Sequence, residues 1–168
     1  QKKDIPPTPP PEKAKSPSSI GPHFEIDYGT VPTGVVHSFS FELINSSTEP
    51  CRFSWESHPN IRIIPGEGHI LPKTSKRCYA VFTSEEPVEL LLEAITCEAY
   101  PIVYENSYDI QTNQWDSEQK TVQWISHLDN VTEVSTKEFL KKREFPLPEP
   151  PHKKSNSGEE KTMVLYVK

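Results

Sequence analysis

The residues of this chain with the clearest chemical potential are its three cysteines and six histidines. Structural zinc sites draw on pairs of such residues about two to four positions apart. No two of them have that spacing, so we predict no metal site and leave open only one assembled across strands. Cys51 and Cys78 lie in phase with apolar neighbours, as core residues do, and no spacing nominates a histidine as their catalytic base. The full set is Cys51, Cys78, Cys97, His23, His37, His58, His69, His127 and His152.

Short catalytic motifs are missing from the sequence, including those of nucleotide-binding loops, serine hydrolases and zinc proteases. Pro65–Gly68 contains two glycines, but no helical pattern follows to complete a phosphate cradle. The acidic neighbours Glu85 and Glu86, like Glu159 and Glu160, would project to opposite sides of an extended chain and could not act as an acid–base pair. We therefore predict a protein that is not an enzyme, with no catalytic residue, no cofactor and no small-molecule substrate.

Composition narrows the protein class further. Proline accounts for 18 of the 168 residues, and apolar residues make up only 33%. Globular chains usually contain about 45–50% apolar residues, so the whole length cannot form one compact core. No apolar run reaches the roughly 18 residues of a membrane helix, so we expect no membrane insertion. An odd number of widely spaced cysteines favours reduced thiols and a cytoplasmic location.

Prolines and charges divide the chain into three segments. Residues 1–22 hold seven prolines and a small positive charge, which is typical of an extended proline-rich linker; it is either a spacer or a ligand for an SH3-type groove. Residues 23–104 carry five basic against eleven acidic residues. Nucleic-acid binding needs clustered basic residues, so we exclude it for this segment. Residues 105–168 form an extension with weaker patterns.

The middle segment alternates between apolar and polar side chains in six or seven short stretches. Within Val35–Asn45, for example, Phe39, Phe41 and Leu43 would share one face of a strand. All prolines of the segment fall between the expected strands. This pattern predicts an all-β fold, an immunoglobulin-like antiparallel sandwich of about seven strands. The expected strands lie in His23–Tyr28, Val35–Asn45, Cys51–Trp55, Ile61–Ile64, Cys78–Phe82 and Val88–Ala99, with His69–Pro72 following a turn.

The extension holds fewer signals. Ser135–Glu138 has the spacing of a capping box and predicts a short helix near 136–143. Met163–Val167 resumes an apolar strand-like pattern whose place in the fold the sequence leaves open. Trp115 and Trp124 are aromatic anchors that would dock the extension onto the sandwich or onto a partner protein.

Aromatic, glycine, asparagine and proline residues also recur in a characteristic order through the middle segment. This series consists of Phe24, Gly29, Val31, Gly34, Phe39, Phe41, Leu43, Asn45, Ser47, Pro50, Phe53, Trp55, Ile64, Pro65, Gly68, Ile70, Pro72 and Phe82. It resembles the ASH/Hydin-like domain, which belongs with the major-sperm-protein and PapD-like immunoglobulin-type sandwiches. The resemblance covers residues 22–104, about half of the chain, and does not extend over the third segment.

The resemblance implies roles in folding, not catalysis, for these residues. Gly29 and Gly34 would form the turn after the first strand, Asn45 would open a strand-to-strand turn, and Pro65–Pro72 would form a later turn. The resemblance also implies a non-enzymatic module of a larger protein of cilia, flagella or centrosomes. Its expected partners are other axonemal or centrosomal proteins, microtubule-associated proteins among them. Its expected location is the cytoskeleton of the axoneme, where the module would support central-apparatus assembly and motility.

Two modes of binding follow from this resemblance. In the favoured mode, an extended segment of an axonemal or centrosomal partner adds a strand to an exposed sheet edge. The alternative is a receptor for acidic peptide motifs at membrane contact sites, as in vesicle-associated relatives of the major-sperm-protein group. Such a receptor needs a basic groove, for which Lys73, Lys76 and Arg77 are the candidates. The net negative charge of the middle segment disfavours this alternative.

Overall fold

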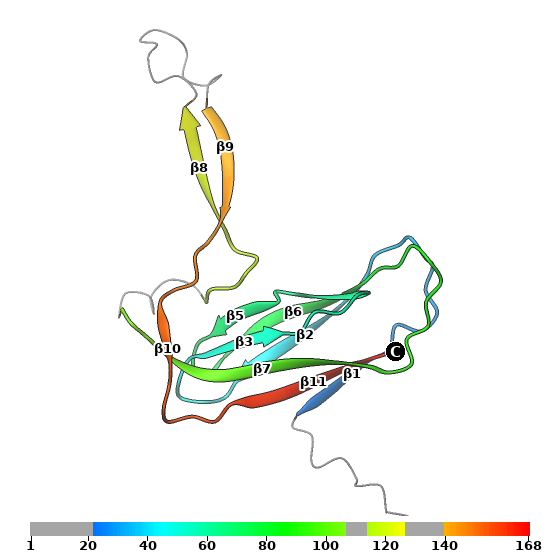
Figure 1. Ribbon diagram of the computed structural model, residues 1–168, viewed down its shortest axis with the longest axis horizontal. Helices are drawn as coiled ribbons and strands as arrows, with labels where there is room; N and C mark the ends of the chain where they lie inside the picture. Colours follow the sequence, from blue (N-terminus) through cyan, green and yellow to red (C-terminus); the bar gives the residue numbers. More distant parts are fainter. Residues whose placement is uncertain (1–21, 107–113, 127–139) are drawn as a thin grey trace, which may run out of the picture.

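Two β-sheets face each other in the computed structural model of this chain, which describes residues 22–106, 114–126 and 140–168 (Figure 1). These residues form eleven strands and no helix, so no described helix has the length or apolar character to cross a membrane. The strands are β1 (His23–Ile26), β2 (His37–Asn45), β3 (Cys51–Trp55), β4 (Ile61–Ile64), β5 (Glu67–Ile70), β6 (Thr74–Phe82), β7 (Glu93–Tyr104), β8 (Lys120–Ser126), β9 (Leu140–Pro146), β10 (His152–Lys154) and β11 (Lys161–Val167).

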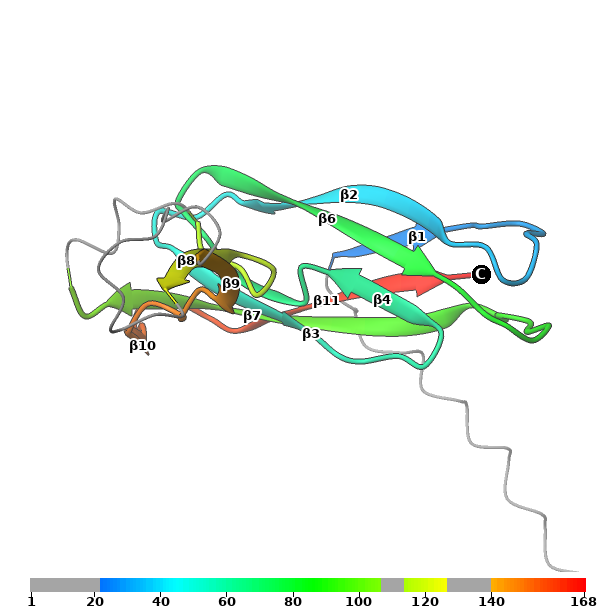
Figure 2. The same cartoon turned by 90° about the horizontal axis from the view of Figure 1, so that it is seen from above.

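The sheet topology confirms the predicted immunoglobulin-like sandwich. The larger sheet has the order β1-β11-β7-β3-β5, with β10 also paired to β7, and the smaller sheet has the order β2-β6-β4. Figure 2 shows β2 and β6 on one side of the sandwich and β3 and β7 on the other. Most neighbouring strands are antiparallel, whereas β1 pairs with β11 in parallel. Strands β8 and β9 form a separate hairpin that projects from the sandwich (Figure 1).

The core between the sheets draws on the middle segment and on the end of the chain. Strand β11 lies between β1 and β7, and its Leu165 and Val167 are fully buried. The third segment therefore supplies an internal strand of the sandwich. This strand contains Met163–Val167, whose place in the fold could not be predicted from the sequence. The other large, fully buried apolar side chains of the described residues are Phe53, Ile26, Ile95, Ile102, Cys78 and Cys97.

Residues 140–143 form part of strand β9, so the prediction of a helix near 136–143 is wrong for them. Residues 136–139 lie outside the described part of the chain. Strand β9 pairs antiparallel with β8 from Ser126↔Leu140 to Lys120↔Pro146. A capping box is a local signal, and intrinsic helix propensities differ by only about 0.7 kcal/mol per residue. Pairing with a neighbouring strand outweighs a preference of that size.

Pro101 lies inside β7, which contradicts the prediction that every proline of the middle segment falls between strands. The ladder between β7 and β11 stops at Ala99, and the ladder between β7 and β10 starts at Ile102. Pro101 therefore occupies a gap between two partner strands, where its missing N–H group removes no ladder hydrogen bond. Its carbonyl still accepts a hydrogen bond from the Ser155 N–H at 2.9 Å.

Two turns depend on particular residues of the series. Gly29 and Gly34 have φ angles of 64° and 70° in the connection from β1 to β2, a conformation that glycine adopts without side-chain strain. The buried Asn45 ends β2 and donates from Nδ2 to the carbonyls of Glu49 at 2.8 Å and Ile70 at 2.9 Å. Since Ile70 belongs to β5, this side chain ties the smaller sheet to the larger one.

We predict that Leu165→Ala lowers the free energy of unfolding by about 2–5 kcal/mol, because it empties a fully buried site in β11. Urea unfolding followed by tryptophan fluorescence measures this change. Thr162→Ala, an exposed position on the same strand, is the matched control and should cost less than about 1 kcal/mol. Equal, small effects of both substitutions would contradict the internal position of β11.

The three thiols provide a test by chemical modification. Burial raises the pKa of Cys51 to about 11 and those of Cys78 and Cys97 to about 12, because desolvation penalises the thiolate. Since the thiolate is the reactive form, alkylation of the native chain at about pH 8 should be slow and should accelerate as the pH rises toward these values. Unfolding in guanidinium should restore ordinary reactivity. Mass spectrometry of labelled peptides over time would contradict this prediction if Cys78 or Cys97 reacted equally fast before and after unfolding.

Candidate functional site

Strand β2 forms an open edge of the smaller sheet. It pairs with β6 along its whole length, from His37↔Phe82 to Asn45↔Thr74, and no strand of the described residues pairs with its other edge. Strand β5, at one edge of the larger sheet, is covered instead. The His69 N–H donates to the carbonyl of Trp115 at 2.8 Å, and the Ser117 N–H donates to the carbonyl of Glu67 at 3.0 Å. A free edge presents main-chain groups to a further strand. Among the described edge strands, β2 offers the longest free edge.

Aromatic side chains beside this edge are only partly covered. Along the inward face of β2, exposure falls from 43% at Phe39 to 7% at Leu43, with Phe41 between them. Phe24 of β1 is 48% exposed, and its ring centroid lies 6.5 Å from that of Phe39. The sequence pattern placed Phe39 on the same face of its strand as Phe41 and Leu43. The structure leaves Phe24 and Phe39 half-exposed because β1 ends its sheet and nothing described covers the first half of β2.

Phe24 borders a mainly apolar groove of about 430 Å³ between β1, β2 and β11, and Phe39 contacts Phe24 from outside the lining of this groove. We term it the β1–β2 groove. Phe41, Trp55 and Met163 line its inner wall, and the Phe41 and Trp55 rings meet edge-on with centroids 5.7 Å apart. An apolar groove next to a free strand edge can accept an extended segment with apolar side chains at alternate positions.

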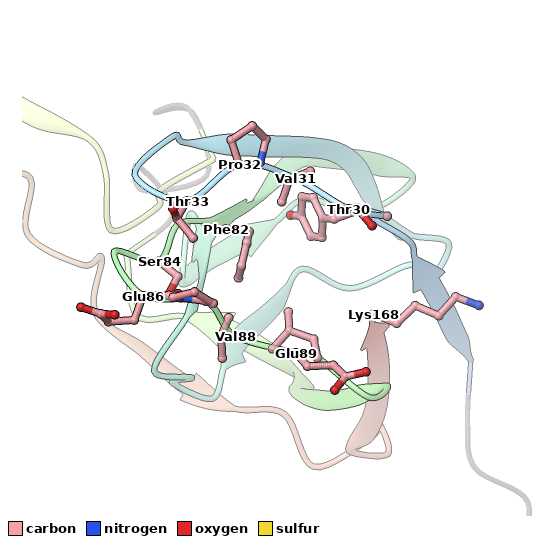
Figure 3. A pocket seen from close by; sticks show the side chains of 14 residues that line it. Thr30, Val31, Pro32, Thr33, Phe82, Ser84, Glu86, Val88, Glu89 and Lys168 are labelled. Carbon is pink, nitrogen blue, oxygen red and sulfur yellow. The ribbon is translucent and has the colours of Figure 1, made fainter.

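A second cavity, of about 420 Å³, lies between the β1–β2 connection and the β6–β7 connection (Figure 3). Thr30–Thr33 and several residues of 84–90 line it, together with Phe82 and Lys168. Neither histidine nor cysteine occurs in this lining.

The basic residues expected to contact an acidic partner are engaged within the chain. Lys76 is largely buried, and its Nζ lies 2.8 Å from Asp116 Oδ2. Arg77 lies 3.5 Å from the Glu42 carboxylate, and the Lys73 ammonium donates to a backbone carbonyl of the β2–β3 turn. Because Lys76 is occupied with the extension, the structure does not gather these three cations into an open groove.

Trp115 docks the extension onto the sandwich, one of the two roles that the sequence left open. It is 7% exposed, and its indole Nε1–H donates to the carbonyl of Leu147 at 2.8 Å. Gly68 makes this approach possible, because a Cβ at this position would lie 3.0 Å from the Trp115 carbonyl oxygen and 2.8 Å from the Phe53 ring. Gly68 thus lies within β5 rather than in the turn that the resemblance implied. Trp124 belongs to β8, and its side chain lies outside the described part.

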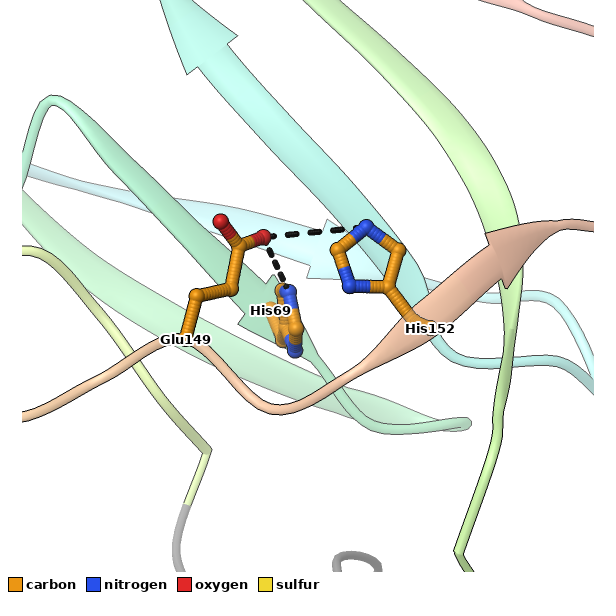
Figure 4. Close-up of side chains that lie close together, drawn as sticks. All are labelled: His69, Glu149 and His152. Carbon is orange, nitrogen blue, oxygen red and sulfur yellow. Dashed lines mark hydrogen bonds and ion pairs between the residues drawn. The ribbon is translucent and has the colours of Figure 1, made fainter.

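A polar cluster lies beside Trp115, where the extension crosses β5. His69 is fully buried, with Nδ1 3.0 Å from the Tyr104 hydroxyl and Nε2 2.9 Å from Glu149 Oε1 (Figure 4). Arg52 donates from Nε to Glu149 Oε1 at 2.6 Å. His152 lies on the other side of Glu149, with 3.7 Å between its Nε2 and Glu149 Oε1.

The environment of this cluster sets its protonation states. Burial lowers the pKa of His69, because desolvation disfavours the imidazolium form. Burial alone would raise the pKa of Glu149, but hydrogen bonds from Arg52 and His69 outweigh it and hold the pKa below its usual range. Near neutral pH the cluster therefore contains a neutral His69, a carboxylate and a guanidinium.

Sequence reasoning missed this cluster because it considered only histidine and cysteine as paired ligands. Including carboxylates would have revealed Glu149-x-x-His152, a spacing of three. His69 comes from a strand 80 residues before Glu149, and no local pattern indicates that the fold brings them together.

No family model matches the sequence. Among curated proteins, the chain is similar to the Hydrocephalus-inducing protein of Mus musculus, with 29% identity over 101 residues. The match covers 60% of this chain and 2% of that protein, so the chain spans a small fraction of the relative.

Among solved structures, the chain is similar to SSP-19, an MSP-domain protein like family member of Caenorhabditis elegans, with a TM-score of 0.31 and 18% identity. That likeness covers 40% of this chain and 61% of the other. The residue series from Phe24 to Phe82, the two-sheet sandwich that contains it and the match to the Hydrocephalus-inducing protein agree with one another. These observations support an ASH/MSP-like domain of the immunoglobulin-type sandwich class in this chain.

Proposed function

We propose that this chain is a protein-interaction module of a larger axonemal protein, and that it helps to assemble the central apparatus of cilia or flagella. The match to the Hydrocephalus-inducing protein supports the ciliary setting, although it covers 2% of that protein. The ASH/Hydin-like sandwich supports a structural role rather than a catalytic one. A scaffold of the centrosome is the related alternative within the same class of protein.

The free edge of β2 beside the β1–β2 groove is the observation that carries the proposal. A partner segment that pairs with β2 would satisfy its outward main-chain groups and place alternate side chains over Phe24 and Phe39. Complete burial of an aromatic side chain contributes about 1.5–3 kcal/mol, so covering the exposed halves of two rings contributes on the order of 2 kcal/mol. This contribution adds to that of the main-chain hydrogen bonds.

Charge indicates the chemistry of the partner segment. The middle segment carries eleven acidic against five basic residues, and Glu42 lies on β2 itself. A neutral or basic segment with alternating apolar side chains is therefore the favoured partner. An acidic peptide is disfavoured, because Lys76 and Arg77 already pair with Asp116 and Glu42.

We predict that Phe39→Lys weakens capture of axonemal proteins by at least about tenfold, since it replaces an exposed aromatic side chain of β2, in contact with Phe24 of the groove, by a charge. The assay uses the full chain with a photo-activated cross-linker at Ser40 of β2, incubated in an axonemal extract, with mass spectrometry of the cross-linked products. Circular dichroism checks that the variant is folded.

Val103→Lys is the matched control, because Val103 is 54% exposed on β7 and lies outside the groove. It should leave cross-linking at Ser40 unchanged. Equal losses in both variants, or axonemal proteins that cross-link to a probe at Val103 and not to one at Ser40, would refute β2 as the docking edge.

A further inference from the structure

Three atoms that can bind a metal ion meet where the extension crosses β5. They are His69 Nε2, Glu149 Oε1 and His152 Nε2, all within 4.8 Å of one another (Figure 4). We propose that these three side chains form a zinc site that fastens the β9–β10 connection to the sandwich. Two imidazoles and one carboxylate are a donor set that zinc accepts, with a fourth position for water.

The position of the His152 ring supports this proposal. Its Nδ1 lies 2.9 Å from the carbonyl oxygen of Pro150, and a carbonyl can only accept, so the ring proton lies on Nδ1. In the neutral ring, Nε2 then carries a lone pair that faces the Glu149 carboxylate at 3.7 Å. Two acceptors that face each other repel, and either a proton on Nε2 or a metal ion between them removes this repulsion. The separation is too long for a hydrogen bond and close to the roughly 3.3 Å between two ligands of a tetrahedral zinc ion.

The second histidine can also supply a lone pair. Without metal, His69 Nε2 donates to Glu149 Oε1 at 2.9 Å and the Tyr104 hydroxyl can donate to Nδ1 at 3.0 Å. A hydroxyl is both donor and acceptor, so it can instead accept a proton placed on Nδ1. Moving the ring proton from Nε2 to Nδ1 frees Nε2 for zinc, with Tyr104 as the outer partner that metal-binding histidines usually have.

The guanidinium of Arg52 would repel a metal ion at this site, but Arg52 has a second carboxylate partner besides Glu149. Its guanidinium reaches the Glu67 carboxylate at 2.5 Å as well as Glu149. A second contact joins Arg52 to Glu149 Oε2 at 3.3 Å. Glu149 can therefore turn Oε1 to the metal while Oε2 and Glu67 hold the guanidinium.

Titration calorimetry of the full, metal-free chain with Zn²⁺ alone tests the proposal. We expect one saturable site, and we expect His152→Gln to weaken its affinity by at least about tenfold, the scale on which even outer-shell changes act. His58→Gln is the matched control, because His58 Nε2 also lies 3.7 Å from a carboxylate, that of Glu93, outside the cluster. His152 lies at the rim of the site, so its substitution leaves the buried His69 in place.

Two further readouts keep the test decisive. Zn²⁺ should raise the midpoint of thermal unfolding of the original chain and of His58→Gln by similar amounts, and that of His152→Gln by less at the same Zn²⁺ concentration, because the stabilisation depends on affinity. Bound Co²⁺ should show the intense visible absorption of a tetrahedral site without a thiolate charge-transfer band. Absence of saturable Zn²⁺ binding, equal affinity in His152→Gln, or a thiolate band that assigns the ion to the cysteines would each overturn the site.

Discussion

Pairing between β11 and β7 is the interaction on which the rest of the sandwich depends. Seven residue pairs join the two strands, from Lys161↔Ala99 to Val167↔Glu93. Because β1 pairs only with β11 among the described strands, the first strand of the domain has no place in the sheet until the last one is present. The core residues Ile26, Leu165 and Val167 are then buried together. The domain is thus closed by a contact between its two ends.

The extension between β7 and β11 is fastened to the sandwich rather than left as a plain linker. Trp115 covers the edge of β5, and Lys76 of the smaller sheet forms an ion pair with Asp116 of the extension. Glu149 binds Arg52 and His69 of the larger sheet. These polar contacts are partly or fully buried, and breaking one partner of such a pair leaves the other unsatisfied, so they fix the course of the extension closely. One edge of the larger sheet is closed in this way, which leaves β2 as the long edge that is open.

The sequence predicted the sandwich well because alternation and turn residues are local signals. It placed β3 and β4 within their observed bounds and identified Asn45 at a strand-to-strand turn. It failed where the outcome depends on distant partners. At residues 140–143 the expected helix is replaced by strand pairing with β8, and Pro101 occupies a gap between two ladders. Phe24 and Phe39 stay half-exposed because no described strand covers them. The His69 cluster was beyond reach for the same reason, since three separate segments meet there.

Parallel pairing of β1 with β11 determines how the domain responds to tension along the chain. The pairs run from His23↔Val164 to Ile26↔Val167, so both strands point the same way. A force that pulls the chain before β1 and after β11 in opposite directions slides these strands past each other along their length. All four residue pairs then bear the load at once, whereas an antiparallel pair pulled from one end would open one hydrogen bond at a time. The same geometry that closes the core therefore makes the domain a mechanically resistant link.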